Sequence, residues 1–266
     1  MRMTMVAVGV ACAAAAHAGG PGLPSSPFGY AVFATGDVTL RNKVRGVNGD
    51  VGSNGGRVLV GQDTPVLGAV VGPRVTMRKD ARAGSLFCLL LEGPGGGACQ
   101  AVTFPVVDPA LLLPVQVVPG TTPLRVPSKG STSPVAPGAY ADVRIGSRGL
   151  LVFAGGTYAV RSIRIQPRGQ LLCQEPCRIG VMERVRLQPR AMLAGTARTR
   201  PSQVHVDVAL TSSSPVFAAA PRATVGALVY APGGRINLRN QGNYVGAFVG
   251  KTVTIEMGAL VQAAGP

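Results

Sequence analysis

Short strand-like triplets recur along this chain, and their spacing limits the possible folds more than any other feature. Each triplet holds a β-branched residue, a polar residue and an aliphatic residue, so its middle side chain points away from the other two. Several successive triplets are 17 to 22 residues apart, which matches one coil of a parallel β-helix. The triplets begin at Val38, Val58, Val75, Val143, Ile163, Val185, Val204, Ile236 and Val253.

A second repeated phrase supports the same architecture. The pattern Val-Gly-Ala-x-Val occurs at 225–229 and 245–249, and with Leu in first place at 67–71. Helical periodicity is nearly absent, while the 37 Gly and 22 Pro supply residues for many turns. The sequence therefore predicts an all-β fold, a right-handed parallel β-helix.

The first eighteen residues have the pattern of a signal peptide. A short basic start precedes an Ala-rich apolar stretch, and Ala16–Ala18 is a small-x-small cleavage site. A lipoprotein alternative would use Cys12, but the residues before it are a poor lead-in. We expect residues 1–18 to be removed and 19–266 to form a single β-helix domain. The mature protein is then secreted, periplasmic or on the surface of a bacterium.

The four remaining cysteines suit an oxidising compartment. Cys88, Cys99, Cys173 and Cys177 allow three pairings, and proximity in the sequence favours Cys88–Cys99 and Cys173–Cys177. Zinc is the rival interpretation, but Cys-x₃-Cys lacks a second close pair and a nearby histidine. The sequence predicts disulfide bonds, with no metal site and no cofactor.

Residues 88–140 interrupt the repeat. This stretch is rich in Pro and Gly, so we interpret it as an irregular insertion, a long excursion between coils stapled by one disulfide. Residues 108–113 within it are expected to form one short helix over the solenoid.

The charge is strongly unbalanced. The chain has 26 Lys and Arg against 11 Asp and Glu, a formal net charge of +15. Most of the cations are arginines, whose planar fork suits phosphate, sulfate and carboxylate groups. A polyanion partner is one interpretation; the other is that a GC-rich genome supplies arginines that only solvate one face.

A repeated block places these arginines in order. Aligned coils would stack Val143, Ile163 and Val185 inside the helix and the arginines that follow them outside. A second set would stack at the next turn. Two ladders of like charge repel unless anions or acids lie between them. The candidate polyanion-binding residues are Arg144, Arg164 and Arg186 on the strands and Arg148, Arg168 and Arg190 at the turns.

The search for catalytic residues gives little. His205 and Asp207 would share one strand face, as a base and its orienter could, but a solvent-facing pair is the simpler interpretation. The acidic residues are scattered singly, without a calcium cluster or matched glycosidase acids. We expect no catalytic residue.

Two segments resemble a known group of proteins. Residues 28–55 and 226–249 are similar to the β-helical domains of exported bacterial surface and pilus-associated proteins, with likeness over about 28–86 and 139–262. The resemblance implies a right-handed β-helix without known catalytic residues. More distant likeness is to bactofilin-type helices, which are cytosolic, and ice-binding helices, whose flat hydroxyl face the arginines would break.

Together these observations predict an exported, non-catalytic structural or surface-interaction protein. Its arginine-laddered face would bind polyanions such as acidic polysaccharide, lipopolysaccharide or extracellular DNA. The alternative function is a β-helix polysaccharide lyase or hydrolase that acts on acidic glycans.

Overall fold

The computed structural model describes residues 22–94 and 97–265, and its fold is a parallel β-solenoid of about 11 turns. Every pairing between its strands is parallel, which confirms the predicted all-β parallel β-helix. The predicted signal peptide and Cys12 lie outside the described residues.

Most strands are short, and three brief 3-10 helices accompany them in the described chain. The elements are η1 (Pro27–Gly29), β1 (Val32–Ala34), β2 (Val38–Leu40), β3 (Gly46–Asn48), β4 (Val51–Ser53), β5 (Arg57–Val60), β6 (Pro65–Met77), β7 (Arg82–Glu92), η2 (Pro109–Leu111), β8 (Leu124–Val126), β9 (Gly138–Ile145), β10 (Leu150–Phe153), β11 (Gly156–Ile165), β12 (Gln170–Cys173), β13 (Cys177–Leu187), β14 (Met192–Gly195), η3 (Pro201–Gln203), β15 (Val204–Val208), β16 (Ser212–Ala219), β17 (Thr224–Gly226), β18 (Leu228–Leu238), β19 (Asn243–Val245), β20 (Phe248–Ile255) and β21 (Leu260–Gln262).

Each full coil contributes three straight strand segments. β9 pairs with β11, β10 with β12 and β11 with β13, so equivalent segments recur one coil apart. The long strands turn a corner within their length, as the register shift between Val160 and Ser162 of β11 shows. The coils therefore build three parallel sheets around one interior.

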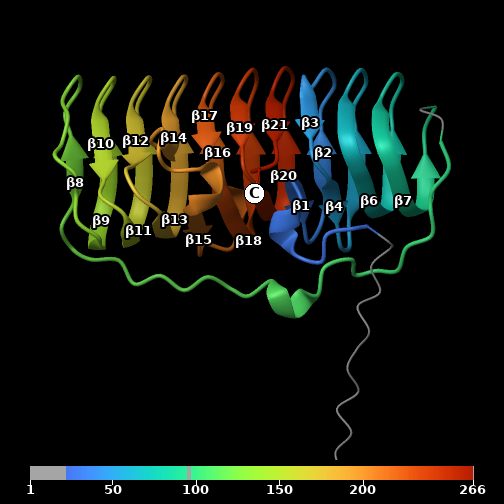
Figure 1. The fold of residues 1–266 in the computed structure, drawn as a ribbon, viewed down its shortest axis with the longest axis horizontal. Helices are drawn as coiled ribbons and strands as arrows, with labels where there is room; N and C mark the ends of the chain where they lie inside the picture. Colours follow the sequence, from blue (N-terminus) through green and yellow to red (C-terminus); the bar gives the residue numbers. More distant parts are fainter. Residues whose placement is uncertain (1–21, 95–96, 266) are drawn as a thin grey trace, which may run out of the picture.

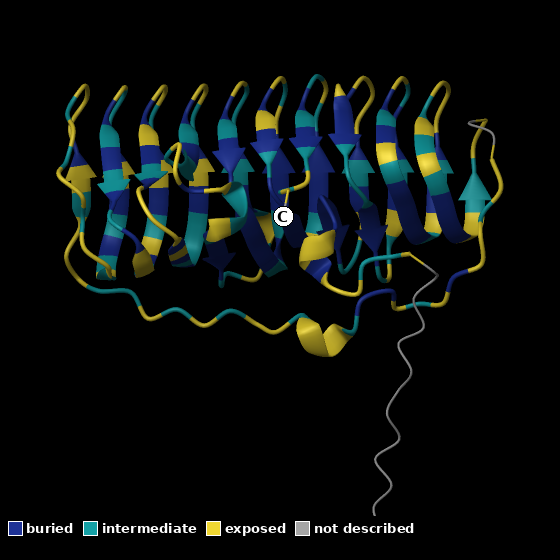
Figure 2. Cartoon of the chain, in the orientation of Figure 1, coloured by how far each residue is buried: buried dark blue, intermediate teal, exposed yellow. Residues whose placement is uncertain are grey.

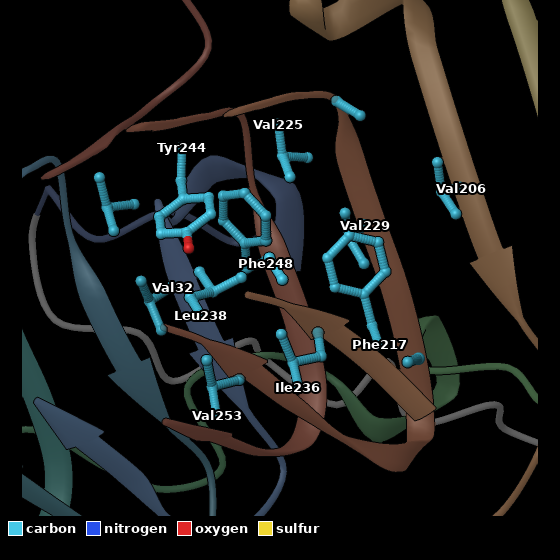
Figure 3. Packing of buried hydrophobic residues seen from close by; sticks show 14 of the residues in the cluster. Val32, Val206, Phe217, Val225, Val229, Ile236, Leu238, Tyr244, Phe248 and Val253 are labelled. Carbon is cyan, nitrogen blue, oxygen red and sulfur yellow. The ribbon is translucent and has the colours of Figure 1, made fainter. Parts of the chain in front are cut away.

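Alternation within each segment fills that interior. Val143 and Ile145 of β9 are buried, while Arg144 between them is exposed. Figure 3 shows the resulting aliphatic and aromatic stack around Phe217 and Phe248, and Figure 2 shows buried residues along the strands with exposed ones at the turns. Each fully buried Val, Leu, Ile or Phe contributes about 1.5–3 kcal/mol, so this stack dominates stability.

The order of coils in space differs from their order in the chain. The first coil lies in the middle of the solenoid, where β1 pairs with both β4 and β20, and β3 pairs with β21 (Figure 1). From there the chain coils to one end at β7. Residues 101–123, which we call the strap, then run along the whole solenoid to β8 at the opposite end, and β9 to β21 fill the space back to the middle.

This path corrects the interpretation of residues 88–140. They do not bulge between neighbouring coils, because the strap joins opposite ends of the solenoid and β8 forms part of the terminal coil. The expected short helix is present as η2. Proline blocks regular strand pairing in this stretch, since it lacks an N–H group, but that property says nothing of where the chain goes.

The strap covers an apolar face that would otherwise be open. Tyr30, Phe33 and Val249 point outward from one sheet and pack against strap residues that include Val106 and Val107. The Asn54 side chain donates to the Val107 carbonyl at 2.7 Å and accepts from its N–H at 3.0 Å. Farther along, the Tyr230 hydroxyl donates to the Leu113 carbonyl at 2.7 Å. These contacts fix the strap along the sheet.

The predicted triplets are all strands, with one error of position. Val143, Ile163 and Val185 stack directly, as expected. Val204 does not continue that stack, because it pairs with Cys177 on the neighbouring sheet, and Phe217 takes the place above Val185. The loop between β14 and η3 lengthens this coil, so the 19-residue interval from Val185 to Val204 does not correspond to one coil.

The repeated Val-Gly-Ala-x-Val phrase is also partly out of register. The copies at 67–71 and 245–249 occupy equivalent corners, but in the copy at 225–229 Val229, not Leu228, pairs with Phe248. The two favoured cysteine pairs lie together, with Cα atoms 5.3 Å apart for Cys88–Cys99 and 6.0 Å apart for Cys173–Cys177. Both distances suit disulfide bonds.

Candidate polyanion-binding face

The predicted strand arginines form one row on the outside of the solenoid. Arg164 pairs directly with Arg144 and with Arg186, and Arg125 of β8 extends the row by one coil. All four side chains are exposed, while their neighbours in each strand are buried or partly buried. We call Arg125, Arg144, Arg164 and Arg186 the strand row. Equivalent positions are about 4.8 Å apart along the axis.

The predicted turn arginines form a second row along the loops at the upper edge of Figure 1. Each occupies the third position of a four-residue turn closed by a backbone hydrogen bond, such as Gly169 N–H to the Gln166 carbonyl at 2.9 Å. Arg148, Arg168 and Arg190 have φ angles of 58°, 61° and 61°. A positive φ at this position, with proline before it in two of the three, is the signature of a type II turn.

Two further cations complete this row, and the repeated block in the sequence did not predict either of them. Lys129 has a φ of 61° and Arg222 a φ of 62°, in the same turn position. Both lie where the sequence shows no triplet, the first inside the expected insertion and the second between the triplets at Val204 and Ile236. A signal was present in the sequence, because Ser128–Gly130 (Ser-Lys-Gly) matches the Ser-Arg-Gly turn at 147–149. In the same way, Pro-Arg-Ala at 221–223 matches Pro-Arg-Ala at 189–191. We call Lys129, Arg148, Arg168, Arg190 and Arg222 the turn ridge.

Backbone hydrogen bonds hold the ridge turns to one another. The N–H of each turn residue donates to the carbonyl of the residue before the next one, at 3.2 Å from Arg148 to Pro167 and from Arg168 to Pro189. The N–H groups of the ridge residues are thus all hydrogen-bonded, while their side chains are exposed. The ridge borders an open groove of about 710 Å³, lined by its five cations and by proline, serine, Asn240 and Gln241. No acidic side chain lines that groove.

Asp142 is the acid that lies beside the strand row. Its carboxylate accepts hydrogen bonds from Arg161 Nε at 2.9 Å, Arg161 Nη2 at 2.6 Å, Ser162 Oγ at 2.8 Å and Arg144 Nη2 at 3.3 Å. These interactions, the Arg161 bond above all, hold the pKa of Asp142 well below its usual range. Within the described chain, no ion pair engages Arg164, Arg186 or the ridge cations.

The cations occupy only part of the solenoid. Beyond Arg186 the outward strand position is taken by Ala218, Asn237 and then Thr254. Beyond Arg222 the turn position passes to Gln241, Gly258, Lys43, Asp63 and Asp80. The strand row is therefore cationic over the four coils from β8 to β13, and the turn ridge extends over these and one further coil, as far as the turn before β17.

The other candidates do not assemble a reactive site. Val204, Val206 and Val208 are buried, as alternation predicts, but Asp207 binds Arg178 Nε of the neighbouring coil at 2.7 Å. Among residues 22–94 and 97–265, no group of His, Cys, Asp and Glu is placed to hold a metal ion. In the same residues no helix is long and apolar enough to span a membrane. A comparison with protein-family models, curated proteins and solved structures finds no match to this chain.

Proposed function

We propose that this chain is an exported, non-catalytic protein that binds linear polyanions along the turn ridge and the strand row. The observation that carries the proposal is the run of five successive turns with a cation at the same left-handed position. In the other described coils this position holds Gln, Gly, Lys and two Asp residues, so the turn itself does not require a cation. A left-handed backbone costs a residue other than Gly roughly 1–2 kcal/mol.

Electrostatics favours an extended anionic partner. Stacking places like charges about 4.8 Å apart in both rows, and no acid in the groove offsets them. A polymer with an acid on successive units would neutralise several cations at once and release its counterions. The paired cysteines suit an oxidising compartment, which supports export.

The test is removal of charge without change of backbone. Gln241 already occupies the equivalent position of the turn that follows the ridge. Arg148→Gln, Arg168→Gln and Arg190→Gln together should therefore keep the turns intact. We expect the triple variant to bind a polyanion such as dextran sulfate at least tenfold more weakly. The dependence of log affinity on log salt should fall by about 2–3, roughly one for each lost contact. Binding is measured by calorimetry over a range of salt concentrations.

A matched control separates the ridge from net charge. Arg45, Arg57 and Arg82 are exposed arginines of the other half, and their replacement by Gln removes the same charge. The control should bind nearly as the parent does. Equal losses in the two triple variants, or no binding by the parent, would refute the proposal.

The alternative is an enzyme that cleaves acidic glycans. Asp142 beside the strand row is held ionised by Arg161, which suits charge pairing better than proton donation. Release of unsaturated or reducing sugar ends from the bound polymer would favour the enzyme, and binding without product would favour the proposal.

A further inference from the structure

We infer that the polyanion is an acidic polysaccharide and that each cationic coil contacts one sugar unit. This inference rests on the proposed function and adds the class of ligand and its length. Stacked coils present one ridge cation about every 4.8 Å, which is close to the length of one pyranose unit in an extended glycan. A glycan chain along the ridge would therefore stay in step with the coils.

Duplex DNA would not stay in step. Its phosphates follow one another every 3.4 Å along each strand, so by the fifth cation the two repeats differ by about 5–6 Å, more than one whole coil. Single-stranded nucleic acid is usually held by aromatic side chains on which bases stack. No aromatic residue lines the ridge groove, and the aromatic rings of Figure 3 are in the interior.

The uncharged lining of the groove suits sugar rings. Ser128, Ser147, Asn240 and Gln241 place neutral hydrogen-bonding groups beside the cations, as hydroxyl groups require. Pro167 and Pro189 add apolar rings between the arginines, against which C–H groups can pack. Acids that point to alternate sides of a glycan would meet the turn ridge and the strand row in turn.

The ridge also has a defined length. Its cations extend over five coils, or about 19 Å from Lys129 to Arg222, and stop at Gln241. The site should therefore be filled by about five acidic sugar units. Longer chains gain only the statistical advantage of more possible registers.

The experiment compares oligogalacturonates of increasing length with single-stranded and duplex DNA of matched charge, at one ionic strength. We expect affinity to rise up to about five sugar units and then level off, and DNA of equal charge to bind at least tenfold more weakly. Gln241→Arg adds a sixth ridge cation and should move the plateau to about six units. Gln262→Arg adds the same charge off the ridge and should leave the plateau unchanged.

The possible results separate the two proposals. If DNA and oligogalacturonate bind equally at matched charge, the protein binds polyanions but the polysaccharide inference is wrong. It is also wrong if Gln241→Arg and Gln262→Arg have the same effect, because only net charge would then matter. If none of the polymers binds, the proposed function fails as well.

Discussion

At the scale of single residues, the turn ridge stands out because its backbone conformation does not explain its side chains. In residues 22–94 and 97–265, ten stacked turns share a left-handed residue, and one of these, Gly258, is the residue type that adopts this conformation freely. Gln, Lys, Asp and Arg occupy the others. The fold thus tolerates a moderate strain in most coils, and five successive coils carry a cation at this position only along the ridge.

Replacement of one ridge arginine by glycine should make the protein more stable. Arg168→Gly removes the left-handed strain and loses no described ion pair, so we expect a gain of about 0.5–1 kcal/mol after the entropy cost of glycine. Arg164→Gly, four residues earlier in the same coil and within strand β11, should instead lower stability. Denaturant midpoints of the two variants measure the difference, and a loss in both would contradict the strain argument.

Asp142 should link stability to acidity. Its folded pKa is depressed, so its contribution is complete above the unfolded pKa of about 3.9 and is lost as the pH falls toward the folded value. The difference in melting temperature between the parent and Asp142→Asn should therefore shrink below about pH 4. The same variant frees Arg144 and Arg161, so polyanion affinity should increase at pH 7. Weaker binding by Asp142→Asn would contradict the assignment of Arg144 to the binding face.

At the scale of elements, local pattern predicted the coils well and their long-range order not at all. The stack of Val143, Ile163 and Val185 followed from alternation and spacing, and so did the two rows of arginines. Lys129 and Arg222 were missed because their strands are short or displaced. The path of the strap could not be read from the sequence, because proline-rich character excludes strands without fixing the neighbours of a segment.

Asn54 tests how the strap is held. Asn54→Ala leaves the N–H and carbonyl of buried Val107 without these partners, at a cost of about 1–3 kcal/mol. We expect faster cleavage by chymotrypsin after the exposed Leu111 of the strap. Asn243 is exposed and has no described side-chain hydrogen bond, so Asn243→Ala serves as the control. Equal cleavage rates in the two variants would show that these bonds do not hold the strap.

At the scale of the whole molecule, the chain is a rearranged form of a simple solenoid. After β21 the coil continues in space into β1, which lies where a next strand would follow. A permuted chain that starts at Thr122, joins residue 265 to residue 28 and ends at Thr121 would run through all coils in order and would keep the strap as its last segment. Because its contacts are closer in sequence, we expect it to refold faster than the parent. Slower refolding of a correctly folded permutant would contradict this, with circular dichroism as the measurement.

The first and last described strands, β1 and β21, lie near the middle of the solenoid, and this determines how the protein can be presented (Figure 1). An attachment made next to either strand would hold the solenoid at its middle, with its two arms projecting sideways. The cationic coils would then occupy one arm, away from the point of attachment. A tethered molecule of this kind would reach outward with its ligand-binding arm, and the opposite arm, which carries charges of both signs, would project the other way.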